Sequence, residues 1–68
     1  RTWMKKGDVV EVIKCESFAN TGTQGWFGIV RAKYFECGEW FVLVSMQGET
    51  SPRLYSECDL VVIKGVSK

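Results

Sequence analysis

The sequence predicts a single all-β domain built from five short strands. Apolar residues fall in short runs that glycines and polar clusters interrupt at intervals of about ten residues, as in small sheet proteins. No segment shows the 3.6-residue apolar periodicity of an amphipathic helix. With 68 residues, the chain has room for one small domain. We therefore expect one domain over residues 1–68, with a core that extends from about residue 6 to residue 64.

The first half of the chain is expected to supply one strand, a long loop and a hairpin. Gly7 and Asp8 form a turn before a first strand over Val9–Lys14, which is rich in β-branched residues. Residues 15–25 are polar and too numerous for a tight turn, so we expect an exposed loop. A second strand over Trp26–Phe35 follows, in which Gly28 marks a bulge or a close backbone approach.

The second half completes the sheet. Residues 36–39 form a compact turn into a third strand over Trp40–Met46, the most strongly β-prone segment. A turn over residues 47–51 leads to a short strand over Pro52–Tyr55, where the proline suits an edge position. We expect a single 3₁₀ turn over Ser56–Asp59 and a last strand over Leu60–Lys64.

Alternation along the predicted strands divides their side chains between two faces. The inward face is expected to carry Val10, Val12, Gly28, Val30, Ala32, Trp40, Val42, Val44, Leu60 and Val62. The opposite face is unusually apolar and carries Val9, Ile13, Ile29, Phe41, Leu43, Val61 and Ile63, among the polar Glu11, Arg31, Lys33 and Ser45. Either strong curvature buries parts of both faces, or another protein or a second copy of the chain covers the outer one.

Aromatic residues outside the expected core indicate a binding groove. Phe18 lies in the long loop, Trp26 and Phe27 follow it, and Tyr55 precedes the 3₁₀ turn. Together they could line a shallow groove, and Glu16 and Glu57 nearby could select a basic ligand. The alternative is that the rings fill the core and the carboxylates are solvated turn residues. Trp40 is expected to fill one end of the core, and Trp3 to cap the other.

The charge balance does not favour nucleic acid as the partner. Nine Lys and Arg residues against eight Asp and Glu residues give a net charge of +1 and no broad positive field. Under the alternative of nucleic-acid binding, phosphates would contact Lys14, Arg31, Lys33 and Arg53, while Trp26 or Phe27 would stack on bases.

The residues available for chemistry are few. The chain has no histidine and three cysteines without a paired CxxC motif, so we expect no metal site, no cofactor and no catalytic set. Three well-separated cysteines favour free thiols and a reducing compartment, which predicts an intracellular protein in the cytoplasm or its equivalent. The longest apolar run, Trp40–Val44, is too short to cross a membrane.

Two motifs carry a resemblance to a known class of modules. The segments GDVVEV over Gly7–Val12 and GWFGIV over Gly25–Val30 resemble the opening of KOW and Tudor-type modules. The order of predicted elements over Lys6–Lys64 is similar to that of a small SH3-like barrel. The resemblance implies a five-stranded barrel with a long first loop and a short 3₁₀ turn before the last strand. KOW modules occur in ribosomal proteins and elongation factors, and Tudor modules hold methylated side chains in aromatic cages.

These observations favour a non-enzymatic binding module that recognises a peptide or protein through the aromatic groove and the outer sheet face. One alternative is a KOW-like nucleic-acid-binding module, and another is a small accessory subunit of a larger complex. The outer face would also allow a homo-oligomer, and no membrane association is expected.

Overall fold

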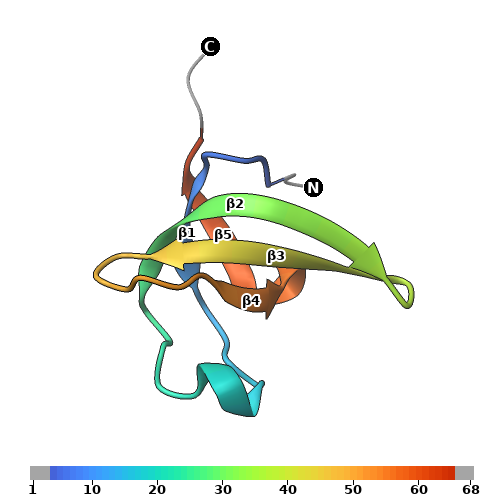
Figure 1. Cartoon of the computed structure of the whole chain (residues 1–68), viewed down its shortest axis with the longest axis horizontal. Coiled ribbons are helices and arrows are strands. Elements are labelled where there is room, and N and C mark those ends of the chain that lie inside the picture. The colour runs from blue at the N-terminus through green and yellow to red at the C-terminus, as the bar shows by residue number, and fades with distance from the viewer. Residues whose placement is uncertain (1–3, 66–68) are drawn as a thin grey trace.

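The chain folds as one antiparallel sheet of five strands. The structure, a computed structural model, describes residues 4–65. In chain order the elements are β1 (Val9–Val12), the 3₁₀ turn η1 (Phe18–Asn20), β2 (Phe27–Glu36), β3 (Glu39–Met46), β4 (Arg53–Ser56), the 3₁₀ turn η2 (Glu57–Asp59) and β5 (Leu60–Lys64). The strand order in the sheet is β4-β3-β2-β1-β5 (Figure 1). The all-β prediction is therefore confirmed.

Most predicted boundaries agree with the structure to within one residue, and β5 agrees at both ends. The first strand is the exception, because it ends at Val12 rather than Lys14. Beyond Val12 the chain turns to the carbonyl of Asp59, which accepts hydrogen bonds from the amides of Ile13 (2.8 Å) and Lys14 (3.3 Å). These bonds fasten the start of the long loop to the 3₁₀ turn η2.

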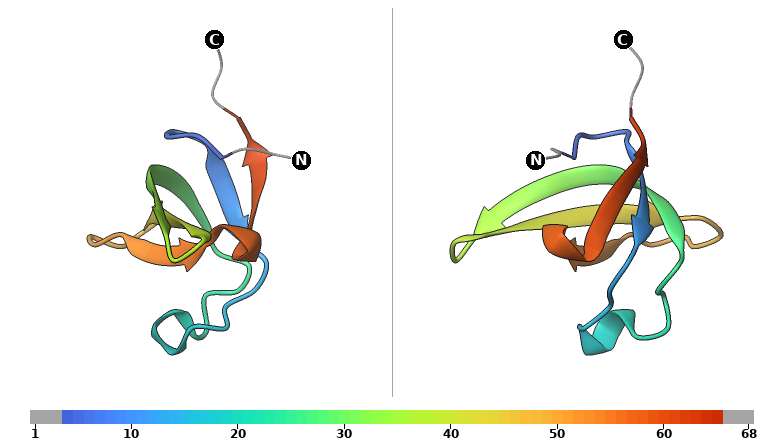
Figure 2. Two further views of the ribbon diagram at one scale, coloured as in Figure 1. Left: turned by 90° about the vertical axis from the view of Figure 1, so that its right-hand side faces the viewer. Right: turned by 180° about the vertical axis from the view of Figure 1, so that it is seen from behind.

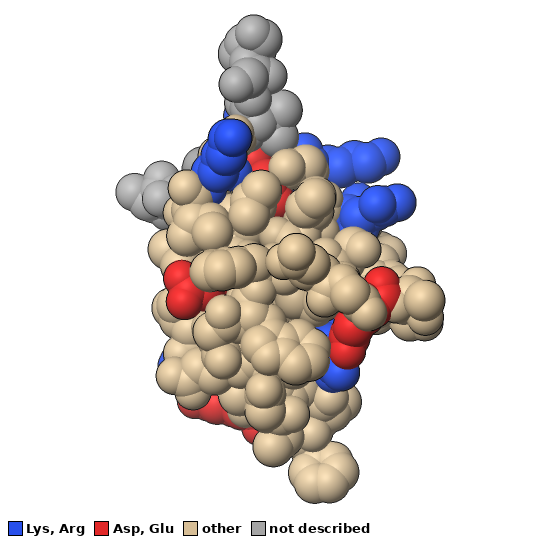
Figure 3. All heavy atoms as spheres, turned by 90° about the vertical axis from the view of Figure 1, so that its left-hand side faces the viewer, with Lys and Arg blue, Asp and Glu red and all other residues tan. Residues whose placement is uncertain are grey.

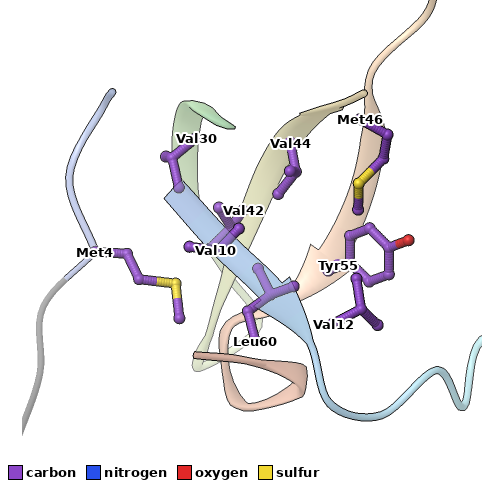
Figure 4. Packing of buried hydrophobic residues seen from close by; sticks show 9 residues of the cluster. All are labelled: Met4, Val10, Val12, Val30, Val42, Val44, Met46, Tyr55 and Leu60. Carbon is purple, nitrogen blue, oxygen red and sulfur yellow. The ribbon is translucent and has the colours of Figure 1, made fainter. Parts of the chain in front are cut away.

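The core is built mainly from valines that face inward across the sheet. Val10, Val12, Val30, Val42 and Val44 are fully buried, each from a position that alternation had assigned to the inward face. The cluster is completed by Met4, Met46, Tyr55 and Leu60 (Figure 4). β-Branched side chains have few rotamers to lose and fill a pleated surface well, which suits so small a core.

A β-bulge at Arg31 changes which side chains of β2 face the core. Val30 pairs with Val44, but the next pair is Ala32 with Leu43, so one extra residue lies in β2. Beyond it Lys33, and not Ala32, lies opposite the buried Val42. The prediction that Ala32 faces inward and Lys33 outward is therefore wrong. Of the two alternatives expected at Gly28, the structure shows the close approach, whereas the bulge lies at Arg31.

The β2–β3 hairpin extends beyond the rest of the sheet. β1 pairs with β2 only at Phe27–Ile29, and β4 pairs with β3 only at Phe41–Val44. The far end of the hairpin therefore projects as two strands, closed by a turn at Cys37 and Gly38 (Figures 1 and 2). Both turn residues have positive φ, 52° and 77°, as a two-residue hairpin turn requires.

Trp40 does not fill an end of the core as expected. It is half-buried on the projecting hairpin, where its ring lies 5.1 Å from that of Phe35 and 4.7 Å from Nζ of Lys33. Trp40 shares a face of β3 with Val42 but lies nearer the hairpin turn, opposite Phe35, so its ring packs on its neighbours in the hairpin instead. The expected cap, Trp3, lies outside the described residues.

The outer face remains largely uncovered. Val9, Phe41 and Leu43 are half-buried. Ile13, Ile29, Val61 and Ile63 are exposed. Curvature of the sheet, which Figure 2 shows from two sides, therefore buries only part of the apolar surface predicted for this face.

Gly28 is the position where the sheet tolerates no side chain. A Cβ there would lie 2.5 Å from Cγ1 of Val44, 2.8 Å from Sδ of Met46 and 2.8 Å from the backbone oxygen of Ser45. We expect Gly28→Ala to lower the free energy of unfolding by about 1–3 kcal/mol, because the core must shift to admit the methyl group.

Gly65→Ala is the matched control, because a Cβ at Gly65 has only Oδ1 of Asp8 nearby, at 3.9 Å. Urea unfolding of the wild type and both variants measures the difference. Equal stability of the two variants would show that the close packing at Gly28 is not a constraint on this fold.

Candidate functional site

Two adjoining hollows form a shallow groove over the start of β2 and the end of β3. The first is lined by Gly25, Trp26, Phe27, Gln47, Gly48 and Glu49. The second is lined by Val9, Phe27, Gly28, Ile29, Ser45, Met46 and Gln47. Because both include Phe27 and Gln47, they are continuous. We call this surface the apolar groove.

The apolar groove exposes large hydrophobic side chains. Phe27 and Ile29 lie on the outer face of the sheet, where they pair with Glu11 and Val9. Each is 46% exposed, and Trp26 is 39% exposed. Figure 3 shows the molecule from this side: uncharged atoms fill the centre of the view and charged side chains lie mainly around its rim. An uncovered surface of this kind is typical of interaction sites.

Arg53 holds Trp26 in place from β4. Its guanidinium carbon lies 5.5 Å from the centre of the indole ring, a cation–π contact. The same guanidinium binds Glu49 through two hydrogen bonds, Nε to Oε1 at 2.8 Å and Nη2 to Oε2 at 2.9 Å. Its third nitrogen, Nη1, donates to the carbonyl of Ala19 at 2.9 Å. One side chain thus connects the long loop, the indole and the turn after β3.

The Arg53–Glu49 pair is charged at neutral pH. The hydrogen bonds from Arg53 lower the pKa of the Glu49 carboxyl, and those bonds raise the pKa of Arg53 in turn. The rim of the apolar groove therefore carries a neutralised pair.

Three buried side chains fix the long loop against β4. The hydroxyl of Thr23 donates to the carbonyl of Asn20 at 2.8 Å, so the Tyr55 hydroxyl must be the donor in its 2.6 Å contact with Thr23. Nδ2 of Asn20 donates to the carbonyl of Leu54 at 2.7 Å. The prediction of an exposed loop is therefore wrong at Asn20 and Thr23, which are buried because these bonds satisfy their polar groups.

The aromatic residues expected to share one groove lie in three environments. Trp26 and Phe27 lie side by side in the apolar groove. Tyr55 is only 2% exposed and belongs to the core, where burial raises the pKa of its hydroxyl. Phe18, at the start of η1, is 94% exposed and lines none of the hollows described here.

The two acidic residues expected beside the rings lie apart from the apolar groove. Glu16 borders a separate hollow that Tyr55 and Asp59 also line. Glu57 accepts a hydrogen bond from Nζ of Lys33 at 3.0 Å, and both side chains are largely shielded from solvent. Neither carboxylate is placed to select a ligand at Trp26.

Three of the four residues expected to contact phosphates bind carboxylates instead. Lys33 pairs with Glu57, Arg53 pairs with Glu49, and Nζ of Lys14 lies 3.8 Å from Glu16. Arg31 is exposed and lines a hollow with Lys6. Three of these four cations therefore already have a carboxylate partner within the chain.

The structure also places the cysteines and the potential metal ligands. All three cysteines, Cys15, Cys37 and Cys58, are free thiols. Among residues 4–65 no group of three or more His, Cys, Asp or Glu side chains is arranged to hold a metal ion. In the same part of the chain no helix has the length and apolar character needed to cross a membrane.

Sequence reasoning missed the contribution of the turn after β3. Gln47 completes the apolar groove because its backbone amide donates to the backbone carbonyl of Phe27 at 3.3 Å. Ile29 was assigned to the outer face but not connected with the indole. The alternation of β2 could have joined Phe27 to Ile29, whereas nothing local to Gln47 indicates its place beside them.

Comparison of the chain with protein-family models, curated proteins and solved structures found no significant match.

The lowered pKa of Glu49 can be tested by titration. Because the pKa is lower in the folded state, the stabilisation by the Arg53 pair is complete above the ordinary pKa of glutamate and is lost as the pH falls through the lowered value. We expect Arg53→Gln to raise the titration midpoint of the Glu49 carboxyl carbon, followed by NMR. Lys14→Gln, which removes a charge paired with Glu16 and not with Glu49, should leave that midpoint unchanged. An identical midpoint in wild type and Arg53→Gln would contradict the assignment.

Proposed function

We propose that this chain is a small SH3-like barrel that binds a segment of another protein along the apolar groove. The observation that carries the proposal is that Trp26, Phe27 and Ile29 are exposed next to one another on one surface. The shape of this surface is fixed by Arg53 and by the hydrogen-bonded long loop. A curved five-stranded sheet with a 3₁₀ turn before its last strand supports the barrel assignment.

A peptide or protein suits the apolar groove better than a charged ligand. Its lining is mainly apolar and includes two rings, two aliphatic side chains and a methionine. The charged residue that lines it, Glu49, is neutralised by Arg53. Apolar side chains of a partner would displace water from Phe27 and Ile29. The backbone of the partner could meet carbonyl groups of the turn at Gln47–Glu49, whose amides at Gln47 and Glu49 already donate to Phe27 and Met46.

Preorganisation adds to the expected affinity. Trp26 is held by Arg53, and the loop that precedes it is fixed by Asn20, Thr23 and Tyr55. Binding therefore costs little additional conformational entropy in this chain. A larger share of the free energy gained by burying apolar surface then contributes to affinity.

The alternative of nucleic-acid binding has less support. The guanidinium of Arg53 and the ammonium of Lys33 are bound to carboxylates, so phosphate contacts would require those pairs to break. A labelled single-stranded oligonucleotide, titrated at low and at moderate salt, tests this alternative. Tight binding that weakens steeply with salt, without any peptide binding, would overturn the protein-binding proposal.

A random dodecapeptide library displayed on phage is the probe for the proposed function. We expect selection on the immobilised wild-type chain to yield sequences with apolar or aromatic residues. Trp26→Ala should weaken binding of a selected synthetic peptide about tenfold or more, by calorimetry, because a central exposed ring is removed.

Ile63→Ala is the control, since Ile63 is exposed and apolar but lies on β5, which does not line the apolar groove. Circular dichroism establishes that both variants remain folded. If Trp26→Ala binds the peptide as tightly as wild type, or unfolds without a separable loss of binding, the apolar groove is not the site.

A further inference from the structure

The apolar groove continues at one end into a basic hollow. Lys6 and Arg31 line this hollow together with Ser45, which also lines the groove and lies opposite Ile29 in the β2–β3 ladder. The amide of Gly7 donates to the carbonyl of Val30 at 2.8 Å, which holds the preceding lysine beside the bulge in β2. Two cations therefore border the apolar groove at this end.

A carboxylate borders the other end of the apolar groove. Glu11 is half-buried on the outer face of β1. In the sheet it lies opposite Phe27 of β2 on one side and opposite Val61 of β5 on the other. Val9, two residues earlier, lies on the same face. The carboxylate is therefore set among apolar side chains, beside the ring at the start of the groove.

These three charges are not compensated within the described part of the chain. Among residues 4–65, the side chains of Glu11, Lys6 and Arg31 form no ion pair and no hydrogen bond. Glu49 and Arg53, by contrast, neutralise each other at the rim beside the indole. A partner charge of opposite sign beside an uncompensated group is favourable, whereas a like charge is repelled.

The distance between the charged ends sets the spacing of matching charges on a partner. Phe27, which lies beside Glu11, and Arg31 are four positions apart in β2, with the bulge at the second of them. At roughly 3.3 Å per residue this span is about 10–13 Å, which an extended peptide covers with about three or four residues. Apolar side chains of the peptide between the two charges would then meet Phe27 and Ile29.

We propose that the partner segment carries a basic residue that meets Glu11 and an acidic residue that meets Arg31 and Lys6, with apolar residues between them. This inference rests on the proposed function, because it assigns the charges of a segment that binds along the apolar groove. Burial of apolar surface supplies the affinity. The flanking charges supply the specificity, because a segment with the opposite charges would place like charges together at both ends.

Parallel selection on charge variants tests this specificity. A random dodecapeptide library displayed on phage is selected on the wild type, on Glu11→Lys and on the double variant Lys6→Glu, Arg31→Glu, and the selected sequences are compared. On the wild type we expect Lys or Arg about three or four positions from Asp or Glu. Glu11→Lys should replace the basic residue by a second acidic one, and the double variant should replace the acidic residue by a second basic one.

Glu36→Lys is the matched control, because it changes the net charge as Glu11→Lys does, at an exposed residue that lines none of these hollows. It should select the same peptides as the wild type. The milder variant Glu11→Gln should lose the preference for a basic residue, and circular dichroism establishes that each variant is folded. By calorimetry, reversing the basic residue of a peptide selected on the wild type should weaken its binding about fivefold.

The outcomes separate this inference from the proposed function. Peptides with the same charges on the wild type, Glu11→Lys and the double variant would overturn the inference, and the proposed function would stand if Trp26→Ala weakens their binding. Peptides that follow the charge at residue 11 but bind Trp26→Ala as tightly as the wild type would overturn the proposed function and leave the charge complementarity in place.

Discussion

The β-bulge at Arg31 is the constraint on which the rest of the structure depends. One extra residue in β2 separates a half that pairs with β1 from a half that continues with β3 alone. Bulges increase strand twist and bend, which here directs the hairpin away from β1. The same shift turns Lys33 inward toward Glu57 and Tyr34 outward. The Lys33–Glu57 ion pair and the divided pairing of β2 therefore follow from one local irregularity.

The long loop shows how a polar segment can be as firmly fixed as a strand. Residues 15–25 have too few apolar side chains to pack by burial alone. Instead Tyr55, Thr23 and Asn20 form a connected series of hydrogen bonds that leads from the core to the carbonyl of Leu54. Hydrogen bonds connected in this way polarise and strengthen one another, and a buried polar group left without a partner would lower the stability of the fold. The loop can therefore hold Trp26 in a defined position at the surface.

The sequence by itself determined the fold class, the order and approximate bounds of the five strands, and the inward valines. These features follow from local periodicity and from turn residues, and both can be read from one segment of the sequence without knowing its neighbours in space. Only the tertiary structure decided that Lys33 faces inward, that Tyr55 is buried and that Gln47 completes the apolar groove. Each depends on residues about twenty to thirty positions away, as Lys33 on Glu57 and Tyr55 on Thr23. Strand register and side-chain pairing set such contacts, and no local pattern encodes them.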